Sequence, residues 1–263
     1  MRASWRHRLL QPIRVRLRDT VSEAVTPLLA QQEQQLAELR AENRRLYDRL
    51  IEFEIRTRRD VVYAADRQAA LESAEFVRAH MPDAPRFDDP HRTLEHALSL
   101  APTGGLALEF GVYTGSTLKI IAAARTSGGV FGFDSFQGLP EDWRIDFPAG
   151  TFGVEGRPEV AGAELVVGWF ADTLPGFLAD HPEPVDFLHV DADLYSSTKT
   201  VLDLVGPRLR PGSVLVFDEF FNFPGWQEHE YRAWREHLER TGLSVSYEGY
   251  SYADEQVVVR ITE

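Results

Sequence analysis

The chain has 263 residues, of which 43% are hydrophobic and 26% charged, an ordinary composition for a soluble globular protein with one large core or one domain and an appendage. It contains no cysteine, which excludes disulfides, zinc–thiolate sites and a thiol nucleophile. No run approaches the roughly 18 apolar residues that span a bilayer, and the short apolar run after the first arginines does not suit a secretory signal. We therefore expect a cytoplasmic protein.

The net charge of −13 is unevenly distributed along the chain. Residues 1–75 hold 14 basic and 12 acidic residues, whereas residues 76–263 hold 14 basic and 29 acidic residues. Nucleic-acid binding needs a basic face to meet the phosphates. The acidic balance of the larger part therefore argues against a nucleic-acid partner.

Residues 1–20 form a basic N-terminal arm, with six arginines and no acidic residue in the first 18 positions. Large apolar side chains recur every four residues between those arginines, at Trp5, Leu9, Ile13 and Leu17. On a helix this spacing makes one apolar stripe with basic flanks, as in helices that lie on membrane surfaces. Pro12 is expected to interrupt the stripe. The arm is either a solvated, partly frayed segment or a weak contact with an anionic membrane or a partner.

Residues 21–75 are predicted to be helical, with a heptad repeat in their first half. Position a holds Leu29, Leu36, Asn43 and Leu50, and position d holds Gln32, Leu39, Leu46 and Phe53. A single Asn at position a favours a parallel dimer in fixed register, and Arg49 at g can meet Glu54 at e of a partner helix. We prefer a short homodimeric coiled coil. The alternative is that the same stripe packs against the globular domain of its own chain.

From residue 76 the pattern becomes that of a globular domain, which begins with a proline-rich loop over 80–92. Short apolar runs then alternate with helix-like runs, which predicts βαβ units and a mostly parallel sheet. The predicted strands are 106–110, 130–134, 164–168, 185–191, 213–220, 243–252 and 256–262, and the predicted helices are 116–125, 172–180, 196–209 and 228–241. The last two strands form an antiparallel hairpin.

A glycine turn follows the first strand. Gly111 and Gly115 let the backbone approach a ligand at a helix N-terminus, and Glu109 precedes them. The spacing is neither the G-x-G-x-x-G of dinucleotide enzymes nor a P-loop, which disfavours a dehydrogenase. Asp134 ends the second strand 23 residues after Gly111, where a carboxylate can accept both hydroxyls of a ribose. Each feature alone also fits a packing turn or a helix cap.

The third strand ends in two aromatic residues, Trp169 and Phe170. Such a pair is either part of the core or flanks an adenine ring. Asp172 or Thr173 is expected to cap the helix that follows.

Four acidic residues stand at the ends of two further strands: Asp191, Asp193, Asp218 and Glu219. Neighbouring parallel strands lie about 4.8 Å apart and ligands bind at their carboxyl ends, so these carboxylates are expected to share one crevice. Crowded carboxylates either trap a proton or hold a cation, and oxygen ligands suit Mg²⁺ or Ca²⁺. The alternative is a helix-capping Asp193 beside one structural Asp.

Together the motifs EFGVYTGST, FDSFQGLPE, VVGWFADTLP, HVDADLYSST and VFDEFFNFPGWQEHEYRAW resemble the S-adenosylmethionine-dependent methyltransferases of the macrocin O-methyltransferase type. The resemblance covers roughly residues 85–263. It implies the class I methyltransferase fold, an α/β, doubly wound and mostly parallel seven-stranded sheet of order 3-2-1-4-5-7-6. It also implies methylation of sugar hydroxyls with Mg²⁺ as the metal, in a methyltransferase domain over 76–263.

The resemblance further implies roles for individual residues. Asp191, Asp218 and Glu219 would hold the metal, and Asp191 would be the general base. Macrolide members of the family usually read Asp-Gly-Asp and Asp-Asp where this chain has Asp-Ala-Asp and Asp-Glu. The expected cofactor contacts are Glu109, Gly111, Tyr113, Gly115 and Ser116 at the methionine end, Asp134, Ser135 and Phe136 at the ribose, and Trp169 and Phe170 at the adenine.

The expected reaction is transfer of the cofactor's electrophilic methyl group to an aligned, deprotonated acceptor oxygen. Two other functions fit the same sequence. One is a metal-dependent methyltransferase of a catechol or another phenol. The other is a coiled-coil scaffold or regulator whose globular domain only binds the cofactor.

Overall fold

The computed structural model describes residues 3–127 and 129–263, with side chains described from residue 15 onward. The chain divides into two compact units, one ending at Ala64 and the other comprising Ala65–Glu263. We describe each unit by itself. No helix among the described residues is long and apolar enough to cross a membrane.

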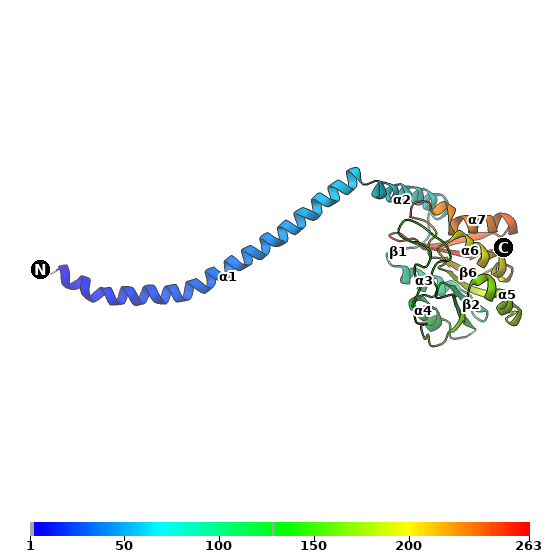
Figure 1. Ribbon diagram of the computed structural model, residues 1–263, viewed down its shortest axis with the longest axis horizontal. Coiled ribbons are helices and arrows are strands. Elements are labelled where there is room, and N and C mark those ends of the chain that lie inside the picture. The colour runs from blue at the N-terminus through cyan, green and yellow to red at the C-terminus, as the bar shows by residue number, and fades with distance from the viewer. Residues whose placement is uncertain (1–2, 128) are drawn as a thin grey trace. The chain divides into compact units, whose positions relative to one another are not determined.

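The first unit consists mainly of one long helix, α1 (Ala3–Arg59), drawn in blue in Figure 1. The helix continues through Pro12 and Pro27, so the predicted interruption at Pro12 is wrong. A proline removes one backbone hydrogen bond, and a long helix absorbs this loss by a local bend. The side chains of Trp5, Leu9 and Ile13 lie outside the described ones, and the role of residues 1–20 stays a prediction.

The heptad stripe of α1 is exposed in the single chain. Leu36, Leu39, Leu46 and Leu50 are 51–62% exposed, and Leu29 and Phe53 are 53% and 57% exposed. The helix ends beside Asp60, whose carboxylate accepts hydrogen bonds from the backbone of Val62 and Tyr63 and so begins the next helix.

The second unit starts within α2 (Val61–His80), earlier than the predicted domain boundary at residue 76. Ala69 and Phe76 of this helix are buried in the core, and Ser73 is buried beside them. The apolar face of α2 is therefore what extends the globular unit toward the N-terminus.

The second unit is built on an eight-stranded sheet of order β1-β7-β8-β6-β5-β2-β3-β4. All neighbouring pairs are parallel except the β6–β8 and β7–β8 pairs, which are antiparallel. The strands are β1 (Arg86–Phe87), β2 (Leu106–Phe110), β3 (Val130–Asp134), β4 (Glu164–Val167), β5 (Val185–Val190), β6 (Val214–Phe217), β7 (Val245–Ser251) and β8 (Val257–Ile261). Without the two-residue β1, the order is the class I methyltransferase order, so the expected fold is confirmed.

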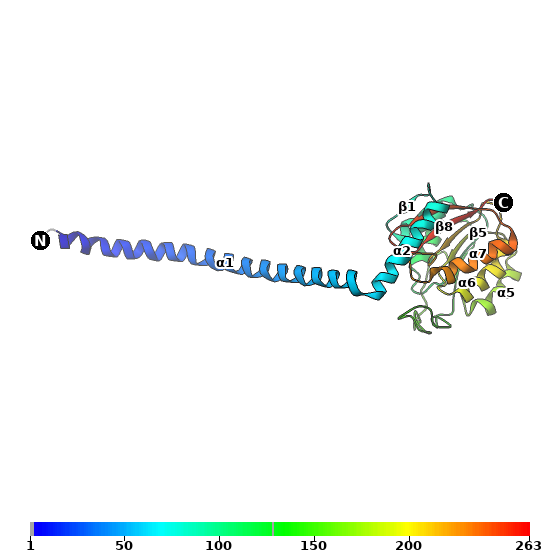
Figure 2. The same cartoon turned by 90° about the horizontal axis from the view of Figure 1, so that it is seen from above.

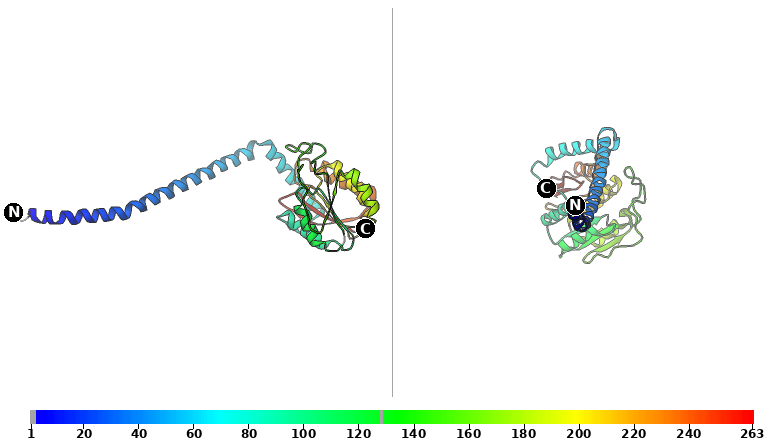
Figure 3. Two further views of the ribbon diagram at one scale, coloured as in Figure 1. Left: turned by 60° about the horizontal axis from the view of Figure 1, so that its bottom comes forward. Right: turned by 90° about the vertical axis from the view of Figure 1, so that its left-hand side faces the viewer.

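Helices cover both faces of this sheet, and each face has its own apolar core (Figures 2 and 3). One core joins the sheet to α2, α5 (Phe170–Asp180), α6 (Tyr195–Val205) and α7 (Glu230–Thr241). The other joins it to α3 (Pro90–Leu100) and α4 (Ser116–Ala124). One 3₁₀ turn, Gly206–Arg208, precedes β6, and another, Trp226–Glu228, precedes α7. Strands buried on both faces read as continuous apolar runs, which is the pattern from which they were predicted.

The prediction of a loop over residues 80–92 is wrong in part. It contains β1, which pairs with β7, and the start of α3. Asp89 caps α3 by accepting a hydrogen bond from the backbone N–H of Arg92, and Pro90 occupies the first turn. An Asp-Pro pair is a helix-start signal that the proline content of the loop obscured.

Candidate active site

A cavity of about 440 Å³ opens at the carboxyl ends of the parallel strands, where an open α/β sheet binds its ligands. The loops after β2, β3, β4, β5 and β6 all contribute to its lining. Six of the ten predicted cofactor residues line it: Gly111, Tyr113, Asp134, Ser135, Trp169 and Phe170.

The other four predicted cofactor residues stand outside this lining. Glu109 and Phe136 are buried in the unit, at 0% and 8% exposure. Gly115 is the N-cap of α4 and Ser116 is the first residue of that helix. Direct contact with a cofactor stays a prediction for all ten residues.

The glycine turn lies against the acidic end of β5. Gly111 has φ +99°, and a Cβ atom at this position would collide with the backbone carbonyl oxygen of Asp191. Only glycine meets both requirements, because it tolerates positive φ and has no side chain. The glycine turn and the segment directly after β5, which carries Asp191, are thus in direct contact.

Asp134 holds this turn in place. Its Oδ2 accepts hydrogen bonds from the backbone of Val112 at 2.9 Å and Tyr113 at 2.8 Å, and its Oδ1 accepts one from Phe136 at 2.7 Å. An ionised carboxylate has about four acceptor positions, so about one is left for a hydroxyl group in the cavity. Asp134 is therefore first an anchor of the turn, with capacity for one further contact.

The aromatic pair begins α5. Trp169 is the N-cap residue, and Phe170 packs edge-on against Phe110 with ring centroids 5.1 Å apart. The helix starts two residues earlier than predicted, so Asp172 and Thr173 lie inside its first turn and the predicted capping role is wrong. The hydroxyl of Thr173 instead donates to the carbonyl oxygen of Trp169 at 3.1 Å. Trp169 and Phe170 line the cavity because α5 begins directly after the short turn that follows β4.

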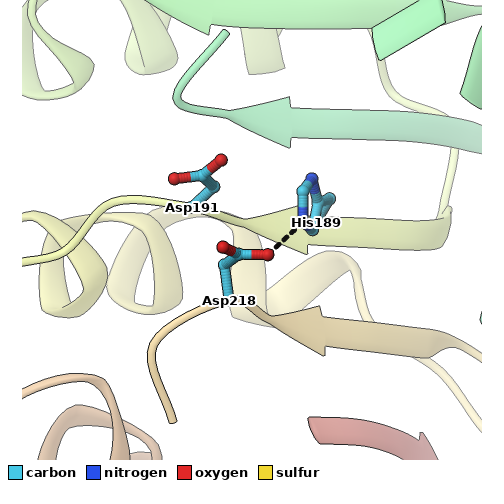
Figure 4. Close-up of side chains that lie close together, drawn as sticks. All are labelled: His189, Asp191 and Asp218. Carbon is cyan, nitrogen blue, oxygen red and sulfur yellow. Dashed lines mark ion pairs between the residues drawn. The ribbon is translucent and has the colours of Figure 1, made fainter. Parts of the chain in front are cut away.

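Three side chains converge where β5 and β6 end. One ligand-type atom of each of His189, Asp191 and Asp218 lies within 4.8 Å of the other two (Figure 4). The strands bring them together because β5 and β6 are adjacent, with the backbone N–H of Asp218 bonded to Val190 at 2.8 Å. The two carboxylates were expected to meet, whereas His189 was not predicted.

His189 connects the acidic group to Glu109. Its Nδ1 lies 2.9 Å from Oε1 of Glu109, and its Nε2 lies 3.5 Å from Oδ1 of Asp218. Burial lowers the pKa of His189, but hydrogen bonds to Asp218 and Glu109 outweigh it and raise this pKa well above its ordinary value. Burial also raises the pKa of Glu109. A histidine within a run of buried strand residues carries no local signal that sets it apart from the core, so the sequence did not indicate this role.

Two further acidic residues, Asp193 and Glu219, lie in the same part of the cavity as Asp191. All three line it. Burial, followed by the negative charge of Asp218, raises the pKa of Asp191 well above its ordinary value. Burial and then the charge of Asp193 do the same for Glu219. Burial raises the pKa of Asp193 to about 7 although Arg144 acts in the opposite direction.

These observations fit a divalent cation. Oε2 of Glu219 is buried and has no hydrogen-bond partner among the described residues. Like charges that approach each other in a buried site favour either a proton or a cation, and the ligands here are mainly carboxylate oxygens. Both ring nitrogens of His189 face carboxylates, Nδ1 toward Glu109 and Nε2 toward Asp218, so the ring bridges these two groups.

Asp193 does not cap α6, as one reading of the sequence supposed. The helix begins at Tyr195 after the N-cap residue Leu194, and Asp193 has φ +60°. Its side chain is 7% exposed and borders the cavity. The left-handed backbone turns this carboxylate toward the same wall as Asp191.

The second unit is similar to known methyltransferases. The sequence profile described as "Methyltransferase domain" matches residues 108–220. A curated relative is the 8-demethyl-8-(2,3-dimethoxy-alpha-L-rhamnosyl)-tetracenomycin-C 4'-O-methyltransferase of Streptomyces olivaceus, 29% identical over 160 residues. The match covers 51% of this chain and 60% of that protein, so the chain matches less than two thirds of its relative's length.

Two solved structures are similar in fold. The calicheamicin methyltransferase CalS11 is 27% identical, with a TM-score of 0.51 over 65% of this chain and 76% of that chain. The O-methyltransferase NovP is 20% identical, with a TM-score of 0.51 over 66% of this chain and 79% of that chain, a likeness of fold. The strand order and these similarities agree that the second unit has the class I methyltransferase fold, with the match to a methyltransferase domain over residues 108–220.

Proposed function

We propose that this chain is an S-adenosylmethionine-dependent and Mg²⁺-dependent O-methyltransferase that acts on a hydroxyl of a sugar or a glycosylated metabolite. The observation that carries the proposal is that Asp191 and Asp218 come together at the ends of β5 and β6, beside a cavity that both Asp191 and Gly111 line. The names of its relatives support the substrate class, because one is a rhamnosyl-tetracenomycin methyltransferase and another a calicheamicin methyltransferase.

The cofactor half of the site is the part built by β2, β3 and β4. The turn at Gly111 offers backbone at close approach, Asp134 has one acceptor position left, and Trp169 and Phe170 offer flat apolar surface for an adenine. These residue types suit an amino-acid end, a ribose and a purine in that order. We propose this orientation for S-adenosylmethionine.

The metal half is the acidic group on β5 and β6. Asp191 and Asp218 would hold Mg²⁺, with Glu219 as a further ligand. When bound, the ion would draw two neighbouring hydroxyls of the acceptor together and favour loss of a proton from one of them.

In the transfer itself, the residues of this chain align the acceptor and remove its proton. Asp191 takes the hydroxyl proton as general base, and Asp193 places a second carboxylate on the same wall. Bound S-adenosylmethionine would supply an electrophilic methyl group, whose carbon–sulfur bond would break as the acceptor oxygen bonds to the methyl carbon, with S-adenosylhomocysteine as the neutral leaving group. Alignment of oxygen, carbon and sulfur supplies much of the rate enhancement.

The experiment that tests this function measures transfer of labelled methyl groups from S-adenosylmethionine to a panel of acceptors. Rhamnosylated aromatic polyketides and nucleotide-linked deoxysugars form one arm, and simple catechols form the other. Methylation of the sugar arm, dependent on Mg²⁺, supports the proposal. Methylation of catechols alone would assign the phenol chemistry instead. Cofactor binding without transfer to any arm or to a crude metabolite extract would favour the scaffold function.

We further propose that α1 pairs with α1 of a second copy as a parallel coiled coil. The exposed stripe from Leu29 to Phe53 with Asn43 at its centre supports this pairing, because a buried Asn is best satisfied by the same Asn of an identical helix. Weak contact of residues 1–18 with an anionic membrane surface and a cytoplasmic location stay predictions.

A further inference from the structure

A buried glutamate on α7 connects the two loops that carry the acidic group. Glu230 is the first residue of α7, and its side chain is 0% exposed. It was not singled out from the sequence, where it stands in a polar run at the start of the predicted helix 228–241. A carboxyl group that is removed from water loses its solvation unless hydrogen bonds replace it. Its position therefore calls for a structural reason.

The hydrogen bonds of Glu230 provide that reason. Oε1 accepts from the backbone N–H of Ala192 at 3.4 Å and from the hydroxyl of Thr198 at 3.2 Å, and Oε2 accepts from the backbone N–H of Glu219 at 3.1 Å. Ala192 directly follows Asp191 in the chain, and Glu219 directly follows Asp218. Each oxygen of one carboxyl group thus holds the residue next to one of the two central carboxylates.

The nearby charges make this arrangement costly, which argues against a role in simple packing. Burial and the negative charges of Asp218 and Asp193 raise the pKa of Glu230 to about 8, although the hydrogen bond from the backbone of Glu219 acts in the opposite direction. Replacing Glu230 by an apolar side chain would leave the N–H groups of Ala192 and Glu219 and the hydroxyl of Thr198 without this acceptor, which destabilises a buried site. A carboxyl group kept among other carboxylates points to a geometric requirement that only two acceptor oxygens at fixed spacing meet.

We propose that Glu230 is a positioning residue that fixes the spacing between Asp191 and Asp218 by holding the backbone of both loops. It does not touch the acceptor or the cofactor and acts through the carboxylates that it aligns. The cofactor half of the cavity rests on loops after β2, β3 and β4, which Glu230 does not bond. Its loss therefore impairs metal binding and leaves cofactor affinity unchanged. This inference rests on the proposed metal site.

The test compares Glu230→Gln with wild type in full-length protein, using Mn²⁺ as a spectroscopic probe of the metal site. The amide keeps one acceptor oxygen, but its NH₂ group faces an N–H donor on the other side, so one loop is released. We expect Mn²⁺ affinity, measured by electron paramagnetic resonance, to fall at least about tenfold, or about 1.4 kcal/mol. S-adenosylmethionine affinity, measured by calorimetry, is expected to stay within about twofold of wild type. Glu239→Gln, on the exposed side of the same helix, is the matched control and should change neither value.

A second measurement separates positioning from charge and does not depend on the variant's stability. In wild type, the amide hydrogens of Ala192 and Glu219 should exchange slowly with deuterium although both lie in loops, and fast exchange of both would overturn the proposal. In Glu230→Gln at least one of them should lose its protection. Weaker Mn²⁺ binding with both amides still protected would assign the effect to charge and also overturn the proposal, as would an equal fall in Mn²⁺ and cofactor affinity. Wild-type protein that binds no Mn²⁺ would instead contradict the proposed metal site.

Discussion

The two units of this chain depart in opposite ways from the usual burial of apolar side chains and exposure of charged ones. In α1, large apolar side chains such as Leu39 and Leu46 are 61% and 58% exposed, whereas in the second unit acidic side chains such as Glu109 and Glu230 are 0% exposed. Single exposed leucines are ordinary, but a periodic row of them is not, and fully buried acids are rare unless they are paired.

Each unit is therefore incomplete in its own way. The stripe on α1 needs an apolar surface, which a second helix with the same stripe supplies. The acidic group at the ends of β5 and β6 needs positive charge, which a divalent cation supplies. The first unit thus predicts a protein partner and the second predicts an ion, and separate variants can test each without disturbing the other.

The largest effect is expected from Asp191→Asn. It removes the proposed base and one metal ligand while keeping the shape of the side chain, so methyl transfer should fall by about 1,000-fold or more. Cofactor affinity, measured by calorimetry, should stay unchanged. Asp203→Asn on the exposed side of α6 is the control. Near-wild-type turnover of Asp191→Asn would remove this residue from the mechanism.

Removal of the metal should have the next largest effect. Dialysis against EDTA is expected to abolish most transfer, and added Mg²⁺ should restore it, because the crowded carboxylates would otherwise repel one another or bind protons. Cofactor binding serves as the internal control and should persist in EDTA. Full turnover in metal-free buffer would mean that the acidic group works without a cation.

A charge in the stripe of α1 should change assembly and leave catalysis unchanged. Leu46→Lys places an ammonium group at a d position, where a partner helix would bury it, and the protein should sediment as a monomer at micromolar concentration. Leu71→Lys introduces the same charge at an exposed leucine outside the stripe and should leave the dimer intact. If wild type itself sediments as a monomer, the stripe has another function.

The smallest effect is expected from Asn43→Leu, which replaces the single polar a position by an apolar residue. Pairing of α1 should become more stable, by about 4–8 °C in melting temperature for each kcal/mol gained in a segment of this size. The oligomeric state should become less uniform, because the Asn that specifies the dimer is lost. Circular dichroism melting and light scattering measure the two changes. A less stable helix pair would argue that position 43 lies outside the interface.

Much of the second unit could be predicted from the sequence because its signals are local. The buried strands are continuous apolar runs, and the carboxylates of Asp191 and Asp218 stand at strand ends that adjacent strands bring together. The missed start of α3 at Pro90 was also a local signal, which the surrounding prolines obscured.

The remaining parts depend on contacts between segments that are distant in sequence. His189 has the same strand context as its apolar neighbours, and its role follows only from the pairing of β5 with β2, which brings Glu109 beside it. Glu230 reaches loops that precede it by 38 and 11 residues, so no spacing rule indicates it. The sequence therefore predicts which carboxylates gather, and the fold shows what holds them there.

The most direct test of the central claim is an anomalous difference map from crystals grown with Mn²⁺ and S-adenosylhomocysteine. A peak between the carboxylates of Asp191 and Asp218, with the product in the cavity beside Gly111 and Asp134, is the result that this account predicts. A cavity that binds the product while those carboxylates hold no metal, or a peak at another place in the unit, would contradict it.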